Sequence, residues 1–236
     1  MNWIVIVAGG NGERMKTPVN KVFLSIARQP IISWTMRVFE NHPLIDAIIL
    51  VVRKQDMAAL DKIIKKGKFK KIRVVLPSEA NRQLSSHKAI DWLKKTAAPE
   101  DLVGIHNAVN PFVTIKEIMA VYAAAGKHGA ALLAQPAKDT IKIINAQQTV
   151  KHTPARQSCW HAQTPQVAKY HLLAKAFKHA RLSHFTGTDD TQLLERIGVY
   201  AKTVPCSNHN IKITYYEDLI FARQLFRNYH LAKNYE

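Results

Sequence analysis

A glycine-rich turn near the N-terminus is the strongest chemical signal in this sequence. The turn Ala8–Arg14 reads AGGNGER and directly follows an apolar run, Trp3–Val7, that predicts a β-strand. Glycines let the backbone turn sharply and approach a ligand, with amide N–H groups facing negatively charged oxygens. The turn lacks the Gly-Lys-Ser/Thr ending of a P-loop, and Met15 stands where the dinucleotide-binding pattern has its third glycine. From these residues alone, a tight turn without a ligand is the alternative to an anion site.

Two basic side chains that follow on the same stretch, Arg14 and Lys21, shift the balance toward an anion site. A nucleoside triphosphate carries about four negative charges, and phosphoryl transfer is accelerated chiefly by positioning and charge neutralisation. The pair therefore favours a triphosphate over a dinucleotide as the ligand. We expect Lys21 to be an exposed loop residue whose replacement lowers turnover with little loss of stability.

These residues must be positioned by a sheet whose strands alternate with helices along the chain. The expected strands are Trp3–Val7, Ala47–Val52, Lys70–Leu76, Asp101–His106 and Ala130–Gln135, and the expected helices are Ser33–Glu40, Asp56–Lys65, Gln83–Lys95 and Ile115–Lys127. This alternation predicts an α/β fold with a mostly parallel sheet.

The pattern changes between residues 136 and 166. Asp139–Thr153 predicts two short strands joined by a polar turn at Asn145–Gln148, and hence a projecting β-arm at about residues 137–166. Further elements are expected after the arm: helices at Tyr170–Ala180, Asp189–Ile197 and Glu217–Tyr229, and a strand at Tyr200–Val204. Because no repeat or linker interrupts the chain, we expect one domain over residues 1–236, with the arm attached to it.

The composition is that of an ordinary soluble globular protein, with 47% hydrophobic and 22% charged residues among 236. No uncharged apolar run reaches the length of a membrane span, and the N-terminus has no export signal, so we expect a cytoplasmic protein. Cys159 and Cys206 are too few for a disulfide framework or an all-thiol zinc site. The scattered histidines show no metal-binding spacing, so we expect no metal ligands from the protein itself.

The net charge of +17 raises the alternative of a polyanion-binding protein. The most basic stretch, Lys62–Arg73, contains only one aromatic residue, Phe69, and few groups that could read bases. We therefore interpret it as a solvated surface and consider nucleic acid an improbable partner.

Seven short motifs, in the same order and spacing, resemble the 2-C-methyl-D-erythritol 4-phosphate cytidylyltransferases. The resemblance covers roughly residues 3–226. The motifs are the glycine turn with Arg14, the segment NKVFL that contains Lys21, the Arg82 and Ser85 pair, DTIK at 139–142, WHAQTPQ at 160–166, TDD at 188–190 and NIKIT at 210–214. Arg156 also stands where this family has an arginine on its dimerisation arm.

The resemblance implies a Rossmann-like nucleotidyltransferase fold and a homodimer joined through the arm. It also implies transfer of CMP from CTP to 2-C-methyl-D-erythritol 4-phosphate in isoprenoid precursor synthesis, with release of pyrophosphate. Mg²⁺ would be bound through the phosphates of CTP. The attacking phosphate is already ionised at neutral pH, so no strong general base is required.

Site residues carry over from the resemblance in three groups. Ala8, Gly9, Gly10, Gly12, Arg82 and Ser85 would bind the nucleotide, with Ser85 near the cytosine. The implied catalytic residues are Arg14, Lys21, Arg156 and Lys212, with Arg156 reaching in from a partner subunit. Asn107, Asn110 and Thr140 would contact the polyol phosphate.

Two departures from the family pattern bear on the acceptor. The family loop reads His-Asp-x-x-Arg-Pro, but here Asn107 and Asn110 replace the aspartate and the arginine. Loss of a charge-assisted hydrogen bond costs about 1.5–3 kcal/mol. The glycine-rich element before Arg82 is also altered, to Ser78–Asn81. These changes predict that the protein still binds the phosphates of CTP. They also predict either a different acceptor or a transferase activity weaker than is usual for the family. A ribitol or other alditol phosphate is the alternative acceptor, and a non-catalytic polyanion-binding relative is the alternative outside catalysis.

Overall fold

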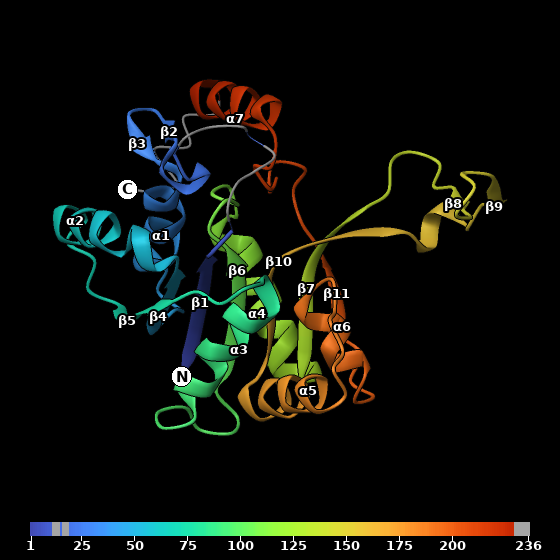
Figure 1. Ribbon diagram of the computed structural model, residues 1–236, viewed down its shortest axis with the longest axis horizontal. Coiled ribbons are helices and arrows are strands. Elements are labelled where there is room, and N and C mark those ends of the chain that lie inside the picture. The colour runs from blue at the N-terminus through green and yellow to red at the C-terminus, as the bar shows by residue number, and fades with distance from the viewer. Residues whose placement is uncertain (11–14, 16–18, 229–236) are drawn as a thin grey trace.

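A seven-stranded sheet forms the centre of the molecule, seen in the computed structural model of Figure 1. The structure describes residues 1–10, 15 and 19–228. The strands lie side by side in the order β11-β7-β10-β6-β1-β4-β5. Their bounds are β1 Asn2–Ala8, β4 Ala47–Val52, β5 Ile72–Pro77, β6 Leu102–Asn107, β7 Ala130–Pro136, β10 Trp160–Lys169 and β11 Lys202–Pro205. All neighbouring pairs are parallel except those of β10, which runs antiparallel to β6 and β7. The predicted α/β fold with a mostly parallel sheet is therefore confirmed.

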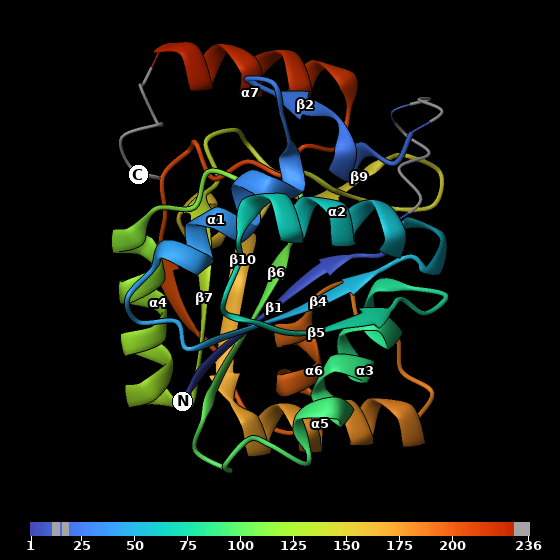
Figure 2. The same cartoon turned by 90° about the vertical axis from the view of Figure 1, so that its left-hand side faces the viewer.

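Helices cover both faces of this sheet (Figure 2). Their bounds are α1 Ile31–Asn41, α2 Met57–Gly67, α3 Arg82–Leu93, α4 Ile115–His128, α5 Tyr170–Leu182, α6 Asp190–Glu195 and α7 Tyr216–Asn228. The short 3₁₀ helices η2 Lys21–Phe23, η3 Lys54–Asp56 and η4 Arg156–Ser158 lie in the connections, and a small hairpin pairs β2 Ser25–Ile26 with β3 Gln29–Pro30. None of the helices in the described parts of the chain is long and apolar enough to span a bilayer.

The two faces of the sheet are packed by alternate residues of the same strands. In β1, Ile4 and Ile6 face the core shared with α1, α2, α4 and α7, whereas Trp3 and Val5 face the core shared with α3, α5 and α6. Side chains that alternate in a strand point to opposite faces, so a strand buried on both sides must be apolar throughout. This explains why continuous apolar runs such as Ala47–Val52 identified the central strands.

Strand β10 is the strand of the central sheet that the sequence pattern did not predict. Its first half, WHAQTP, is polar and mostly exposed, and it pairs only with β7 before a register shift between Ala162 and Gln166. It therefore carries neither an apolar run nor a clear alternation. Within the range predicted for the arm, β8 Ile143–Ile144 and β9 Val150–His152 form the expected hairpin, but residues from Trp160 onward belong to the central sheet. Figure 1 shows the hairpin extending away from the sheet.

Candidate active site

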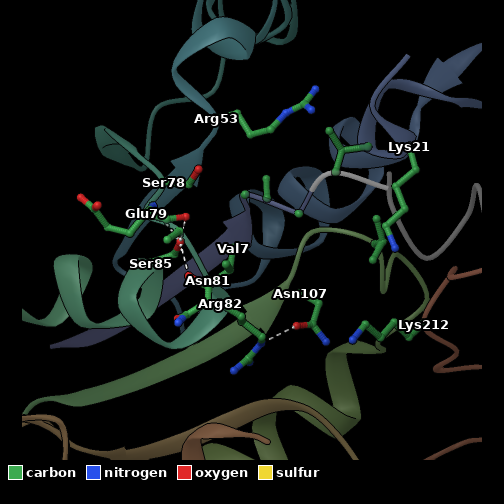
Figure 3. A pocket seen from close by; sticks show the side chains of 16 residues that line it. Val7, Lys21, Arg53, Ser78, Glu79, Asn81, Arg82, Ser85, Asn107 and Lys212 are labelled. Carbon is green, nitrogen blue, oxygen red and sulfur yellow. Dashed lines mark hydrogen bonds between the residues drawn. The ribbon is translucent and has the colours of Figure 1, made fainter. Parts of the chain in front are cut away.

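A cavity of about 440 Å³ lies where the parallel strands β1, β4, β5 and β6 end. The carboxyl ends of parallel strands are where open α/β sheets bind ligands. Its described lining comes from six segments far apart in the chain, several of them shown in Figure 3: Val7–Gly10, Lys21, Val22, Arg53, Ser78–Arg82, Ser85, Asn107, Val109 and Lys212. The sheet therefore gathers the glycine turn and several distant polar residues around one space.

The glycine turn approaches a neighbouring loop very closely. A Cβ atom on Gly9 would lie only 2.5 Å from Cβ of Ser78, whereas a Cβ on Gly10 would meet no atom within 4 Å. Gly9 is therefore required by the contact between the turn after β1 and the loop after β5. Gly10 is exposed and lines the cavity, where its backbone is accessible to a ligand.

The loop after β5 is closed by hydrogen bonds at the start of α3. Asn81 caps this helix by accepting a hydrogen bond from the N–H of Leu84 (2.8 Å). The Ser85 hydroxyl donates to the carbonyl oxygen of Asn81 (2.8 Å) and accepts from the N–H of Glu79 (3.0 Å). Ser85 is almost fully buried, so its hydroxyl holds the loop, which presents its backbone to the cavity.

Arg82 carries a fixed positive charge between α3 and the sheet. Its Nη2 lies 2.6 Å from Oδ2 of Asp190, and its Nε donates to Oδ1 of Asn107 (3.1 Å). Burial alone would lower the pKa of Arg82, but the Asp190 carboxylate outweighs burial and raises the pKa. The guanidinium therefore stays charged and holds the side chain of Asn107.

The orientation of the Asn107 amide follows from its partners. A guanidinium only donates hydrogen bonds, so the atom of Asn107 that faces Arg82 must be the oxygen. The nitrogen, Nδ2, then donates to Oδ1 of Asn110 (3.2 Å). Figure 3 shows the oxygen turned toward Arg82 and the nitrogen on the side of Lys212. Asn107 thus presents a neutral donor on that side.

The second departure, Asn110, lies beneath the cavity and not in its lining. It is fully buried, and its Nδ2 lies 3.4 Å from Oδ1 of Asn210 and 3.5 Å from Oε1 of Gln163. Asn210 in turn donates to the carbonyl oxygen of Thr164 (3.0 Å). Asn110 therefore connects β6, β10 and the segment that leads to Lys212, and any effect on a ligand passes through these neighbours.

A buried histidine completes the support of this loop. His106 Nε2 lies 2.9 Å from the carbonyl oxygen of Asn110, which only accepts, so the proton belongs on Nε2. His106 Nδ1 then accepts from the Thr164 hydroxyl (3.0 Å), whose oxygen accepts from the N–H of Asn107 (3.3 Å). Burial, with a smaller contribution from the charge of Arg82, lowers the pKa of His106 to about 4, against weaker raising effects from its hydrogen bonds. The imidazole is therefore neutral at physiological pH.

The two described lysines of the site differ in their surroundings. Lys21 begins η2 and is only 9% exposed, so the expectation of an exposed loop lysine is wrong. The turn at η2 is held by Asn20, whose side chain accepts from the N–H of Val22 and donates to Asp56 (2.8 Å). Lys212 is exposed on a segment without regular structure, where the N–H of Ile213 donates to the carbonyl oxygen of Val109 (2.9 Å). Both lysines line the cavity.

The remaining sequence-based site residues lie elsewhere. Arg14 and Gly12 fall outside the described residues. Thr140 and Arg156 are exposed beside the arm, and Arg156 Nη1 donates to the carbonyl oxygen of Lys138 (3.2 Å). Lys138 lines a second, shallow depression of about 220 Å³, together with Gln135, Pro136, Asp139, His161 and Asn208. One subunit therefore brings Lys21, Lys212 and the glycine turn together, but it leaves Thr140 and Arg156 outside the main cavity.

Arg53 is a lining residue that sequence reasoning missed. It directly follows β4, the strand next to β1, so its position at the carboxyl end of a parallel strand was an available signal. Its Nε lies 2.6 Å from Oδ2 of Asp56, which fixes the guanidinium at the edge of the cavity.

The described lining does not fit a metal ion held by the protein. Mg²⁺ prefers carboxylate, phosphate and water oxygens. The one carboxylate among the described lining residues, Glu79, is ion-paired with Lys88, and the amide oxygen of Asn107 accepts from Arg82. Across the described residues, no group of three or more His, Cys, Asp or Glu side chains is arranged to hold a metal.

Comparison with known proteins gives consistent results over almost the whole chain. The family model for 2-C-methyl-D-erythritol 4-phosphate cytidylyltransferase matches residues 3–228. The chain is similar to proteins of that name from Desulforamulus reducens, at 39% identity over 94% of each chain, and from Geobacter metallireducens, at 34% identity over 94% of this chain and 96% of the relative. Among solved structures, it resembles the 4-diphosphocytidyl-2C-methyl-D-erythritol synthase of Anaerococcus prevotii, with a TM-score of 0.84, 31% identity and 96% coverage of both chains.

Proposed function

The chain belongs to the 2-C-methyl-D-erythritol 4-phosphate cytidylyltransferase family, and we propose that its cavity binds CTP and transfers CMP to 2-C-methyl-D-erythritol 4-phosphate. It is a CTP-dependent nucleotidyltransferase of isoprenoid precursor synthesis. In this reaction a phosphate oxygen of the acceptor forms a bond to the α-phosphorus of CTP, while the bond to the leaving pyrophosphate breaks. We also propose a cytoplasmic location, because nucleoside triphosphates such as CTP are made and used there.

One observation carries the assignment of the site. Lys21 and Lys212, far apart in the sequence, line the same cavity as the glycine turn after β1. Cationic side chains beside accessible backbone N–H groups neutralise the charge that spreads over a triphosphate as the leaving group departs. This convergence supports phosphoryl transfer from a nucleotide.

The proposed roles follow from where the side chains lie. The backbone at Gly9 and Gly10 is proposed to bind the triphosphate, with Lys21 and Arg53 near its phosphates. The loop after β5, held by Ser85, is proposed to contact the cytosine. Lys212 and the Asn107 nitrogen lie on one side of the cavity and are proposed to bind the acceptor. Mg²⁺, when it is bound to the nucleotide, supplies further neutralisation of phosphate charge; we propose that it arrives on CTP.

We propose that Thr140 and Arg156 act in the cavity of a second subunit. Both are exposed beside the hairpin, which extends away from its own sheet, and the hairpin carries the exposed apolar residues Ile144 and Val150. A homodimer would cover these residues and supply an arginine to each site. Arg156→Ala and Lys21→Met, each inactive alone, should regain part of the activity when mixed, because one site of the mixed dimer is intact. Mixtures without any recovery would contradict the shared site.

The substrate assignment is tested by pyrophosphate release. The purified protein is incubated with CTP and either 2-C-methyl-D-erythritol 4-phosphate or D-ribitol 5-phosphate, and kcat/KM is measured for each. We expect the methylerythritol phosphate to be the better acceptor. Faster release with ribitol phosphate would instead assign the alditol branch, and no release with either acceptor at high protein concentration would contradict the proposed function.

A further inference from the structure

The described lining of the nucleotide cavity carries an excess of positive charge. It includes four basic side chains, Lys21, Arg53, Arg82 and Lys212, and one acidic side chain, Glu79. Arg53 and Arg82 are ion-paired with carboxylates outside the lining, and Glu79 is ion-paired with Lys88, so a smaller positive excess remains. A cavity with low-dielectric walls and charges of one sign attracts ligands of the opposite sign. Metal-free CTP carries about four negative charges, about two more than its complex with Mg²⁺. The lining therefore favours the more highly charged, metal-free form.

Three carboxylates in or near the described lining are paired with cations. Glu79 pairs with Lys88, Asp56 lies 2.6 Å from Arg53, and Asp190 lies 2.6 Å from Arg82. These pairs compete with any divalent ion for the carboxylate oxygens. A metal bridge from the nucleotide to the protein would have to break one of them.

Asn107 also lines the cavity, and its side-chain oxygen already accepts a hydrogen bond. It is the last residue of β6, and its Oδ1 accepts from Arg82 Nε, so the amide turns its nitrogen toward the side of Lys212. An N–H donor is complementary to a phosphate oxygen and repels a cation. At this position the side chain therefore interacts favourably with the anion and unfavourably with a metal.

From this geometry we infer that the protein binds CTP without a divalent ion at least as tightly as it binds Mg-CTP, and that the absence of a carboxylate at position 107, where Asn107 stands, sets this preference. The inference rests on the proposed function, since it concerns the same nucleotide site. In the bound state, the side chains of Lys21, Arg53, Arg82 and Lys212 neutralise the phosphate charge of CTP. The metal, when present, is held by the nucleotide and not by the protein.

The test compares CTP binding with and without metal by isothermal titration calorimetry. CTP is titrated into the full-length protein once in excess chelator and once in saturating Mg²⁺ at matched ionic strength. We expect the Kd in chelator to be equal to or lower than the Kd in Mg²⁺. A Kd in chelator that is about tenfold or more higher would overturn the inference, because it would show a bound metal stabilising the complex through the protein. Activity with Mg²⁺ but no binding in chelator would leave the proposed function intact, whereas no binding in either condition would contradict both.

Two variants at one position separate charge from hydrogen bonding. Asn107→Asp should reverse the preference, weakening metal-free binding by about tenfold or more relative to Mg-CTP, because a carboxylate repels bare phosphates and can ligate the metal. Asn107→Ala, which adds no charge, should keep the wild-type preference. Asn145→Asp adds the same charge on the distant hairpin and serves as the matched control. An unchanged preference in a folded Asn107→Asp protein would contradict the role given to this residue; should that variant fail to fold, the wild-type comparison decides the main inference alone.

Discussion

The backbone N–H of Ser207 donates to Oε1 of Glu117 across 2.5 Å, although the two residues are 90 positions apart. The other carboxylate oxygen accepts from the N–H of Thr114 (2.7 Å), and the Thr114 hydroxyl accepts from the N–H of Glu117 (3.3 Å). Glu117 is thus part of the capping box of α4 and also the anchor of the segment that leads to Lys212. The start of α4 and the segment before Lys212 are thus held by one buried carboxylate.

Replacement of Glu117 by glutamine should therefore affect both stability and turnover. The amide can accept from one of the two N–H groups but presents a donor to the other, which leaves a buried mismatch that costs about 1–3 kcal/mol. We expect a lower free energy of unfolding by denaturant and a several-fold lower kcat, because the segment before Lys212 loosens. Glu195→Gln, at an exposed position, is the control. A kcat equal to wild type in a clearly destabilised Glu117→Gln protein would show that the anchor does not position Lys212.

Removal of charge at either lysine should reduce turnover far more than stability. Lys21→Met and Lys212→Met keep most of the aliphatic side chain while deleting a cation from the cavity lining. By analogy with the loss of one group that stabilises a transition state, kcat should fall about 10²–10³-fold. The free energy of unfolding should change by about 1 kcal/mol or less. Lys202→Met, on an exposed part of β11, should leave kcat unchanged, and a comparable loss of kcat there would mean that overall charge matters more than the site.

The sequence predicted the order of elements well where packing leaves a periodic signature. Ala47–Val52 is buried along its whole length, and the predicted strand has the same bounds as β4. A helix was also predicted to begin at Asp189, and this residue caps α6, because its side chain accepts from the N–H of Gln192 (2.9 Å). Strand β10 was not predicted, because half of it lies at the polar end of the sheet, where no alternation of buried and exposed residues is required.

The site was predictable only as far as strand ends and glycine spacing could indicate it. Lys21 and Lys212 came from motifs, and the fold brings both to one cavity. The sequence could not show that Lys21 is buried, or that Asn107 is held by Arg82, because both depend on contacts between segments distant in the chain. Arg53 belongs to none of the motifs, and it lines the cavity because β4, which it follows, pairs with β1.

The two adjacent glycines of the turn should respond very differently to alanine. Gly9→Ala places a Cβ 2.5 Å from Cβ of Ser78, so the turn and the loop after β5 must separate, whereas Gly10→Ala meets no neighbour. Overpacking of this kind costs about 1–3 kcal/mol. Thermal denaturation should show a clearly lower Tm for Gly9→Ala and a small change for Gly10→Ala. Equal Tm values for the two variants would contradict the close contact between the turn and the loop.

The burial of His106 predicts a loss of stability in mild acid. Burial lowers the pKa of the folded histidine to about 4, while an unfolded histidine titrates near its usual pKa of about 6.5. Between these values the unfolded chain binds a proton that the folded protein does not, so stability is complete above the unfolded pKa and falls as the pH falls toward the folded pKa. Between about pH 7 and pH 4.5, the burial of His106 should lower the free energy of unfolding by about 2–3 kcal/mol.

Denaturant unfolding of wild type and His106→Gln at several pH values measures this contribution. Glutamine can donate to the carbonyl oxygen of Asn110 and does not titrate, so the variant should lose about 2–3 kcal/mol less than wild type over the same pH interval, even if it is less stable at neutral pH. His171→Gln, at an exposed position, is the control and should follow the wild-type curve. Parallel curves for wild type and His106→Gln would mean that the buried imidazole is not the group whose protonation opens this loop.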